Sequence, residues 1–399
     1  MRILSLILIS LGLCISAGTQ AAESSKKSKS KNKSSVPATG ASYAKRPDAA
    51  AWAERMAQEN QLDPKWVKAQ LAQAKLIPSI PKLILPPAQV SQKNWAAYRA
   101  RFIEPKRVQA GLQFWQRHQT LLMQAEQAYG VPPWLIVGVI GVETFYGQHT
   151  GNFRVLDALS TLTFDFPKEH PRATERQTFF SKELAQFLIM ASKEKINPTK
   201  LKGSYAGAMG LPQFMPSSWA NFAVDFDGDK HIDLFNNPAD VIGSVANYFK
   251  AFQWQTGMPT HYPVKFDAAL LDMDALMAPD ILPTFNVNSF QTKGAVIEGD
   301  ALLHKGPLAL IELLNGNEPP SYVAGTENFY AITRYNWSSY YAMAVIELGQ
   351  AVAREKREQR LSRSGGGHGR TPTHVGWSPL LHPWTSAEPA LKGNQDSWL

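Results

Sequence analysis

The sequence predicts a mainly helical protein of the α+β class, in which a small β-rich subdomain interrupts a helical chain. Three observations support this fold class. Apolar residues recur at spacings of three and four over several long segments, as they do on one face of an α-helix. Proline and capping residues stand where such helices would begin. About residues 260–333, by contrast, form short β-rich runs broken by Pro, Gly and Asn.

The N-terminal helical region comes first. Residues 50–75 are alanine-rich with helical apolar spacing, and Asp63 and Pro64 fit a cap and a first-turn position. Further along the chain, Thr174 and Gln177 fit a capping box before another amphipathic run. We place the remaining helices at residues 91–103, 106–129, 132–146, 175–195, 216–222, 238–252 and 336–358.

The β-rich subdomain contains four short runs, which read "HYPVKF", "TFNVNSFQ", "GAVIEGD" and "NFYAITRYN". The last helix follows this subdomain and extends into residues 351–399. After about residue 358 the sequence has no periodicity and many Gly, Pro and Ser residues, so we expect a disordered tail.

The length and composition are those of a large globular protein. The chain has 399 residues, of which 44% are hydrophobic and 19% are charged. Such a chain can bury a large core in one unit or in two or three closely joined ones.

Residues 1–21 have the features of a secretory signal peptide. Arg2 is followed by an apolar stretch, and Thr19 and Ala21 are small residues placed as a signal peptidase reads them. The apolar run is too short for a membrane anchor. We therefore expect cleavage near Ala21, export, and a periplasmic location.

The only cysteine, Cys14, lies inside this leader. A lipoprotein would need small residues before it, but Leu13 stands there, so we expect no lipid anchor. The mature chain then has no cysteine, which excludes a cysteine nucleophile.

The net charge of +8 is confined to the ends of the chain. Residues 22–45 include a Lys/Ser-rich linker, and basic residues exceed acidic ones again from residue 351. Residues 37–350 contain equal numbers of basic and acidic residues. The folded body therefore lacks the basic surface that nucleic-acid binding requires, and we expect no nucleic acid partner.

Glu143 is the most unusual charged residue of the chain. It ends an apolar run in the stretch "VIGVETFYG", and on a helix its neighbours are apolar and aromatic. Loss of water raises the pKa of a carboxyl, which is how a glutamate is kept protonated as a general acid. A structural glutamate paired with an arginine across a helix interface fits the spacing equally well.

Four stretches together resemble the lytic murein transglycosylases of the B type, and the resemblance covers nearly all of residues 50–350. Each stretch is long, and they follow one another in the family's order. They are "GVETFYGQHTGNFRVLDALSTLTFDFP" (141–167), "GSYAGAMGLPQFMPSSW" (203–219), "DFDGDKHIDLFNNPADVIGSVANYF" (225–249) and "ITRYNWSSYYAMAVIELG" (332–349).

The resemblance implies a lysozyme-like helical catalytic region over residues 46–350. It also implies cleavage of the β-1,4 bond from N-acetylmuramic acid to N-acetylglucosamine in peptidoglycan, with formation of a 1,6-anhydro ring. Glu143 would be the sole acid and base: it protonates the glycosidic oxygen and then takes the proton of the muramic acid 6-hydroxyl. By match to the family, the groove is lined by Ser204, Gln213, Tyr248, Tyr335, Asn336 and Tyr341.

Two readings of other classes stay open. A hydrolytic, lysozyme-like muramidase would need a second carboxylate, for which Asp157 and Asp165 are the nearest downstream candidates. We assign both a structural role. A non-catalytic peptidoglycan-binding scaffold would keep the groove without the chemistry, although the presence of Glu143 and Gln213 argues against it.

The acidic loop 225–236 has the spacing of an EF-hand metal site. Lys230 stands where glycine is usual and Asn236 stands where a bidentate glutamate is usual. The resembling family binds calcium in such a loop, so we expect a structural calcium or sodium ion rather than a solvated Asp-Gly turn. The expected ligands are Asp225, Asp227, Asp229, His231 at the backbone-ligand position, Asp233 and Asn236.

No cofactor is expected to take part in the chemistry. The expected partner is the peptidoglycan glycan strand, together with proteins of cell-wall synthesis or remodelling. We expect the protein itself to be a monomer.

Overall fold

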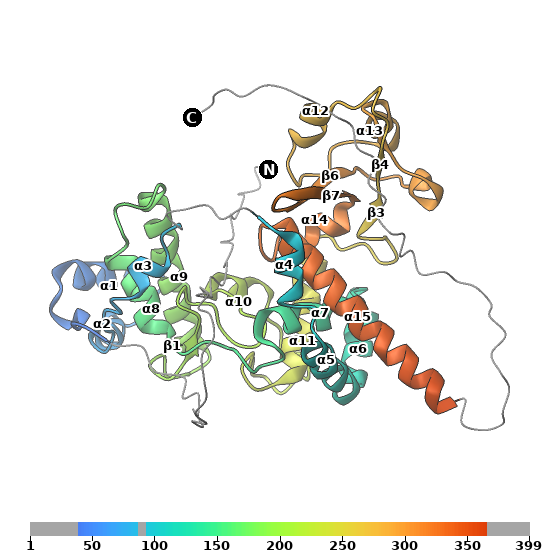
Figure 1. Ribbon diagram of the computed structural model, residues 1–399. Coiled ribbons are helices and arrows are strands. Elements are labelled where there is room, and N and C mark those ends of the chain that lie inside the picture. The colour runs from blue at the N-terminus through green and yellow to red at the C-terminus, as the bar shows by residue number, and fades with distance from the viewer. Residues whose placement is uncertain (1–38, 87–92, 365–399) are drawn as a thin grey trace, which may run out of the picture. The chain divides into compact units, whose positions relative to one another are not determined.

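A computed structural model describes residues 39–86 and 93–364 (Figure 1). The described residues up to Arg357 form one compact unit, and residues 358–364 belong to a second. Helices dominate the described residues, and the strands are short. The predicted fold class, mainly helical with a small β part, is therefore confirmed.

Several predictions on the ends of the chain fall outside the described residues. These are the signal peptide, most of the Lys/Ser-rich linker and the tail from residue 365. Among the residues that the structure describes, none of the helices has the length and apolar character needed to cross a membrane.

One group of helices combines the N-terminal region with two helices from the middle of the chain. Helix α1 contacts α2, α3 contacts α8, and α8 contacts α9 (Figure 1). The elements of this group are η1 (Tyr43–Lys45), α1 (Pro47–Glu59), α2 (Pro64–Ala72), α3 (Ile80–Leu83), α8 (Val155–Phe164) and α9 (Ala173–Lys193).

The predicted cap at Asp63 is confirmed. Its side chain accepts a hydrogen bond from the backbone N–H of Lys65 at 2.9 Å, and Pro64 is the first residue of α2. Residues 50–75 therefore form two helices, because α1 ends at Glu59 with Asn60 as its C-cap and the extended Asp63 begins α2.

A second group of helices surrounds α7, which ends beside Glu143. Helices α5 and α6 contact α7, and α11 contacts both α6 and α7. The elements of this group are α4 (Trp95–Ala100), α5 (Pro105–Arg117), α6 (Gln119–Tyr129), α7 (Pro133–Thr144), α10 (Pro216–Phe222), α11 (Pro238–Ala251) and α15 (Ser339–Ser364).

Helix α7 is apolar on all sides and nearly all of its residues are buried. Glycines bring its backbone against that of α15. A Cβ added at Gly138 would lie 2.3 Å from the carbonyl oxygen of Val345, and one at Gly349 would lie 2.1 Å from that of Trp134. This close approach places the first turn of α15 beside the end of α7, where Glu143 lies.

The predicted capping box at the start of α9 is wrong. The helix begins at Ala173, so Thr174 already lies in its first turn and no side chain caps it. Gln177 instead donates to the carbonyl oxygen of Thr163, near the end of α8, at 2.8 Å. The unsatisfied carbonyls at the end of α8 offered this side chain a tertiary partner.

The β-rich subdomain has its own small core. Strand β7 (Glu318–Gly325) pairs antiparallel with β3 (His261–Pro263) and β6 (Ala309–Asn315), and β4 (Lys265–Phe266) pairs with β5 (Ala295–Val296). A further two-stranded pair, β1 (Phe153–Arg154) with β2 (Lys202–Gly203), lies outside this subdomain.

Two runs that we predicted as β-rich are largely helical. Most of "TFNVNSFQ" forms α13 (Val287–Thr292), and most of "NFYAITRYN" forms α14 (Glu327–Thr333). The reason is local capping: Asn286 accepts from the N–H of Ser289, and Thr326 accepts from that of Asn328. The subdomain also contains α12 (Met273–Met277) and η2 (Gly299–Leu303).

Other helix boundaries differ from the predicted ones. The segment 106–129 divides at His118 into α5 and α6, and α8 occupies a segment in which we placed no helix. Helix α15 continues to Ser364, beyond the loss of apolar periodicity at residue 358. This extension contains Gln, Leu and two Arg, which have high helix propensity, beside two Ser, so it can continue the helix without an apolar face.

Candidate active site

Glu143 lies one residue before the end of α7, and its side chain is half-buried. The Tyr341 hydroxyl donates to Glu143 Oε1 at 2.6 Å. Burial raises the pKa of Glu143 from its ordinary value of 4.5 to about 7, and the Tyr341 hydrogen bond offsets part of the rise. Within residues 39–86 and 93–364, no ion pair involves Glu143. The alternative of an arginine-paired structural glutamate is therefore not what the structure shows.

Three tyrosines form a layer behind this carboxyl. The rings of Tyr341 and Tyr335 stack with centroids 6.2 Å apart, and Tyr248 lies 4.8 Å from Tyr335. All three side chains are buried. The Tyr335 hydroxyl donates to the Pro212 carbonyl at 2.5 Å and the Tyr248 hydroxyl donates to that of Arg334 at 2.6 Å. Tyr335 and Tyr248 therefore build the wall of the site, and only Tyr341 directs its hydroxyl at Glu143.

The loop 203–213 contains Ser204 and Gln213, and it contacts the end of α7, where Thr144 Oγ1 donates to the Leu211 carbonyl at 3.0 Å. Ser204 Oγ accepts from the N–H of Ala208 at 3.0 Å. Gln213 has a positive φ of 51° and donates through Nε2 to the carbonyls of Gly210 and Thr150, at 2.8 and 3.2 Å. These bonds hold the amide in the turn and leave its carbonyl oxygen to accept from a ligand.

Asn336 follows Tyr335 at the end of α14 and is half-buried. Its Oδ1 is buried and has no hydrogen-bond partner among the residues that the structure describes. An acceptor left unpaired in a buried place costs about 1–3 kcal/mol, so this atom gains from a ligand that donates to it.

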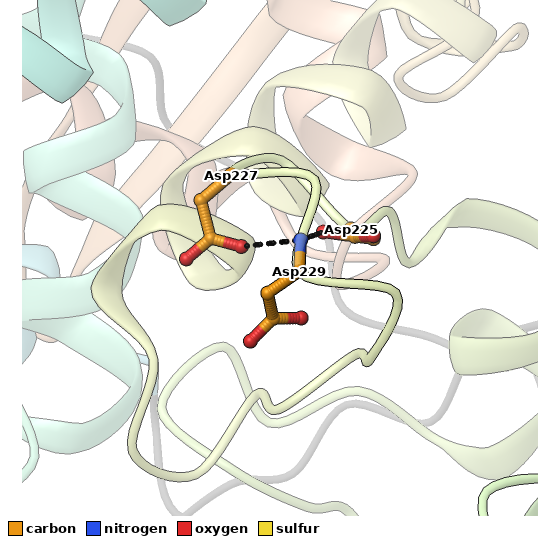
Figure 2. A group of neighbouring side chains, drawn as sticks. All are labelled: Asp225, Asp227 and Asp229. Carbon is orange, nitrogen blue, oxygen red and sulfur yellow. Dashed lines mark hydrogen bonds between the residues drawn. The ribbon is translucent and has the colours of Figure 1, made fainter.

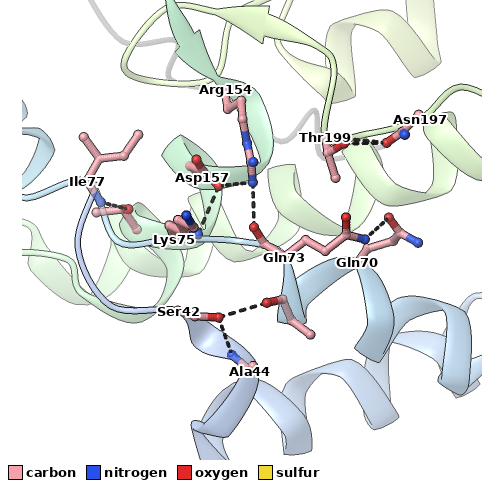
Figure 3. A network of polar contacts seen from close by, with 12 residues as sticks. Ser42, Ala44, Gln70, Gln73, Lys75, Ile77, Arg154, Asp157, Asn197 and Thr199 are labelled. Carbon is pink, nitrogen blue, oxygen red and sulfur yellow. Dashed lines mark hydrogen bonds and ion pairs between the residues drawn. The ribbon is translucent and has the colours of Figure 1, made fainter. Parts of the chain in front are cut away.

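Asp157 and Asp165 are both tied to the N-terminal segment. Asp157 is 1% exposed and accepts from Arg154 Nη2 at 2.7 Å and from the N–H of Lys75 at 3.0 Å (Figure 3). Asp165 accepts from Arg46 Nη1 at 2.6 and 2.8 Å and from the Tyr43 hydroxyl at 2.6 Å. Both carboxylates are thus paired with arginine and hold α8 to residues 43–75.

The acidic loop brings three carboxylates together. Oxygen atoms of Asp225, Asp227 and Asp229 lie within 4.8 Å of one another (Figure 2). Lys230 has a φ of 72°, the left-handed conformation for which we expected glycine. Carboxylate oxygens in such a group suit a hard cation such as calcium.

The other three predicted ligands make local hydrogen bonds, and their role as ligands stays a prediction. Asp233 Oδ1 accepts from the N–H groups of Phe235 and Asn236, and Asp233 Oδ2 accepts from Asn236 Nδ2. These two side chains therefore serve a local turn, apart from the three clustered carboxylates. His231 is exposed, and its N–H donates to Asp229 Oδ1 at 2.8 Å.

Two residues of these sites were missed from the sequence. Asp240, fully buried in α11, accepts from the N–H groups of Phe226 and Asp233 and so holds both ends of the acidic loop. Tyr98 of α4 lies close to Glu143: burial, and then the charge of Glu143, raises the pKa of Tyr98 to about 12. Asp240 stands in the first turn of a predicted helix, where an acid is ordinary, and nothing near Tyr98 in the sequence marks it.

Comparison with known proteins gives one consistent family. The protein-family model described as "Transglycosylase SLT domain" matches residues 44–350. The membrane-bound lytic murein transglycosylase B of Escherichia coli (strain K12) is 41% identical over 329 residues, which are 79% of this chain and 85% of that protein.

Solved structures agree with this relationship. The Escherichia coli lytic transglycosylase Slt35 in complex with calcium has a TM-score of 0.70 and 40% identity, over 81% of this chain and 97% of that one. SltB3 from Pseudomonas aeruginosa in complex with NAG-anhNAM-pentapeptide has a TM-score of 0.63 and 27% identity, over 76% of this chain and 79% of that one.

Proposed function

The chain belongs to the transglycosylase SLT domain family and is a peptidoglycan lytic transglycosylase, and we propose that Glu143 supplies both its acid and its base catalysis. One observation supports this role above all: the half-buried Glu143 has no ion-pair partner among the described residues, and burial raises its pKa to about 7. Such a group is protonated in a large fraction of molecules near neutral pH. It can therefore donate a proton and take one back.

The reaction balances with this one group. Glu143 donates its proton to the glycosidic oxygen, and the bond from the muramyl C1 to that oxygen breaks. The ionised Glu143 then takes the proton of the muramyl 6-hydroxyl, and the oxygen of that hydroxyl forms a bond to C1. No water is consumed, because the attacking hydroxyl is already part of the substrate and has a high effective molarity.

The surrounding groups support each step. The Tyr341 hydrogen bond occupies Oε1 and stabilises the ionised form, which leaves Oε2 for the substrate. The Gln213 carbonyl oxygen can accept from a sugar amide, and the buried Oδ1 of Asn336 can accept from a sugar hydroxyl. Ser204 shapes the same loop. The relative SltB3 binds a glycopeptide that contains an anhydro muramyl unit, which agrees with a groove of this kind.

A hydrolytic muramidase would need a second carboxylate to activate water. Asp157 and Asp165 are engaged by arginines, as described above. Glu183, another buried carboxyl, accepts from the N–H and the hydroxyl of Ser217 and caps α10. Each of these carboxylates thus has a structural partner, which favours the single-glutamate reaction over hydrolysis.

Calcium would have a structural role. The carboxylates of Asp225, Asp227 and Asp229 would hold the ion, and Asp240 would fix the loop around it. An ion there would neutralise three clustered charges and supply no step of the reaction. The calcium complex of the relative Slt35 supports this assignment.

The place of action follows from the substrate. We propose that residues 1–21 are removed as a signal peptide and that residues 46–350 act in the periplasm as a monomer. The relative from Escherichia coli is described as membrane-bound, so its attachment differs from that expected here.

Digestion of purified sacculi in heavy-oxygen water tests the reaction. We expect mass spectrometry to show muropeptides with anhydro muramyl ends that contain no label, because the ring closes within the substrate. Reducing muramyl ends with stoichiometric label would establish the muramidase instead. Absence of any released muropeptide would leave a scaffold that only binds.

A further inference from the structure

The chain turns sharply directly after Glu143. Phe145 and Tyr146 both have left-handed backbone conformations, with φ of 52° and 55°. Glycine usually occupies such positions at a helix end, because a side chain there strains the backbone. Strain of this kind persists only where the surrounding structure holds it, so the contacts of these two residues are informative.

Arg107 of α5 holds the first of them. Its Nη1 donates to the carbonyl oxygen of Gly141, in the last turn of α7, at 2.9 Å. Its guanidinium carbon lies 4.5 Å from the ring centroid of Phe145 and 5.1 Å from that of Phe102. The planar cation therefore joins the backbone just before Glu143 to the side chain just after it.

Tyr146 is held by a matched space between two helices. A Cβ added at Gly111 of α5 would lie 2.3 Å from the Tyr146 hydroxyl, and one at Gly141 of α7 would lie 2.4 Å from it. The Tyr146 ring also packs on Phe114, with centroids 5.5 Å apart. The absence of side chains at the two glycines thus leaves room for the Tyr146 ring. A change in the backbone conformation of the turn would displace this ring from its packed position.

We propose that Arg107 is a positioning residue that fixes the Phe145–Tyr146 turn and so sets the direction in which Glu143 presents its carboxyl. Arg107 forms no ion pair with Glu143 among the described residues; it acts through Gly141 and Phe145. The proposal rests on the proposed role of Glu143. It concerns the geometry of the acid and not its identity.

The test compares Arg107→Met with Arg107→Lys, and uses Arg46→Met as a matched control. Arg46 makes the same kinds of contact at the end of α8: it donates to the Phe164 carbonyl and lies over two aromatic rings. A displacement of about 1 Å in a catalytic group can cost about 10²-fold in rate. We expect Arg107→Met to lower kcat by that order with KM nearly unchanged, at a temperature where the melting curve shows full folding.

The lysine variant should recover part of this loss, because an ammonium can still donate to Gly141 but cannot stack flat on Phe145. Arg46→Met should lower the melting temperature and leave kcat of the folded enzyme unchanged. A wild-type kcat in folded Arg107→Met would overturn the proposal.

A double-mutant cycle with Phe145→Gly covers the case in which Arg107→Met does not fold. Glycine relieves the backbone strain, so this variant should fold and yet lose kcat, because the ring that Arg107 holds is gone. If Arg107 acts through Phe145, adding Arg107→Lys to Phe145→Gly should cause little further loss. Multiplied losses would contradict the proposal, and so would an unchanged kcat in Phe145→Gly.

Glu143→Gln separates this failure from that of the proposed function. Activity in the Glu143→Gln variant would show that Glu143 is not the catalytic acid. An inactive one beside a fully active Arg107→Met would leave the acid in place and remove only its positioning by Arg107.

Discussion

The ends of α7 and α8 are built alike but leave their carboxylates in different states. Each helix ends beside an acidic residue, Glu143 in one case and Asp165 in the other. Each end is also contacted by an arginine that lies over aromatic rings. Arg46 bonds the carboxylate of Asp165 itself, whereas Arg107 bonds only the backbone of α7.

The position of the cation decides what each carboxylate can do. Nη1 of Arg46 donates to both oxygens of Asp165 and thereby uses this carboxylate for a cross-link. Glu143 has a tyrosine in place of the arginine, so burial is the largest influence on its pKa. Under the proposed function, the protein uses a carboxylate for stability at one helix end and a carboxylate for proton transfer at the other.

The largest effect expected from this comparison is that of Glu143→Gln. The amide keeps the shape and can still bond to Tyr341, but it can neither donate nor accept the catalytic proton. We expect activity on sacculi to fall by about 10²–10⁴-fold, with folding and glycan binding retained. Substantial residual turnover at full folding would show that Glu143 is not the acid.

The pH dependence of activity should follow Glu143 as well. The acid must be protonated in the free enzyme, so kcat/KM should fall about tenfold per pH unit above pH 7. A profile that stays flat to pH 9 would contradict a raised pKa.

Stability should show the same titration with a definite sign. Between pH 4.5 and 7 the unfolded chain releases the Glu143 proton and the folded chain retains it, so ionisation disfavours folding as pH rises. Glu143→Gln should therefore melt higher than the wild-type protein at pH 8, and the difference should vanish near pH 4. Equal differences at both pH values would exclude this linkage.

Asp165→Asn should give the opposite pattern of effects. It removes the partner of Arg46 and of the Tyr43 hydroxyl, and a hydrogen bond to a charged group contributes about 1.5–3 kcal/mol. Chemical denaturation should show a loss in this range, while kcat of the folded enzyme stays at the wild-type value. Asp157→Asn should likewise retain the catalytic activity. Loss of turnover in either folded variant would support the muramidase reaction with that aspartate as the second carboxylate.

The acidic loop tests a third state, in which carboxylates cluster without an arginine. Added calcium should raise the melting temperature. The free energy of unfolding should increase by about 1.4 kcal/mol when the free calcium concentration is tenfold above the Kd. Asp225→Ala should abolish that rise with little change in rate. A melting curve that does not respond to calcium would make the loop an ordinary turn.

Much of the fold could be predicted from local signals. Asp63 and Pro64 begin a helix because their chemistry acts within one turn, and α10, α11 and the buried α7 follow from short-range patterns. The errors occur where a distant partner competes. Gln177 bonds to the carbonyl of Thr163 and does not form the expected capping box. The run around Val287 is helical because a local cap outweighs its β propensity.

For the site, the sequence by itself determined which functional groups are present. These are one glutamate in an apolar run, acidic residues at EF-hand spacing, and the family motifs that contain the residues expected in the groove. Only the tertiary structure decided which carboxylates meet a cation. Glu143 and Asp165 cannot be told apart by their neighbours in the chain, because Arg46 lies 119 residues from Asp165 and Tyr341 lies 198 residues from Glu143. A pKa depends on water and charge within a few ångströms, and at these two helix ends packing between distant segments sets both.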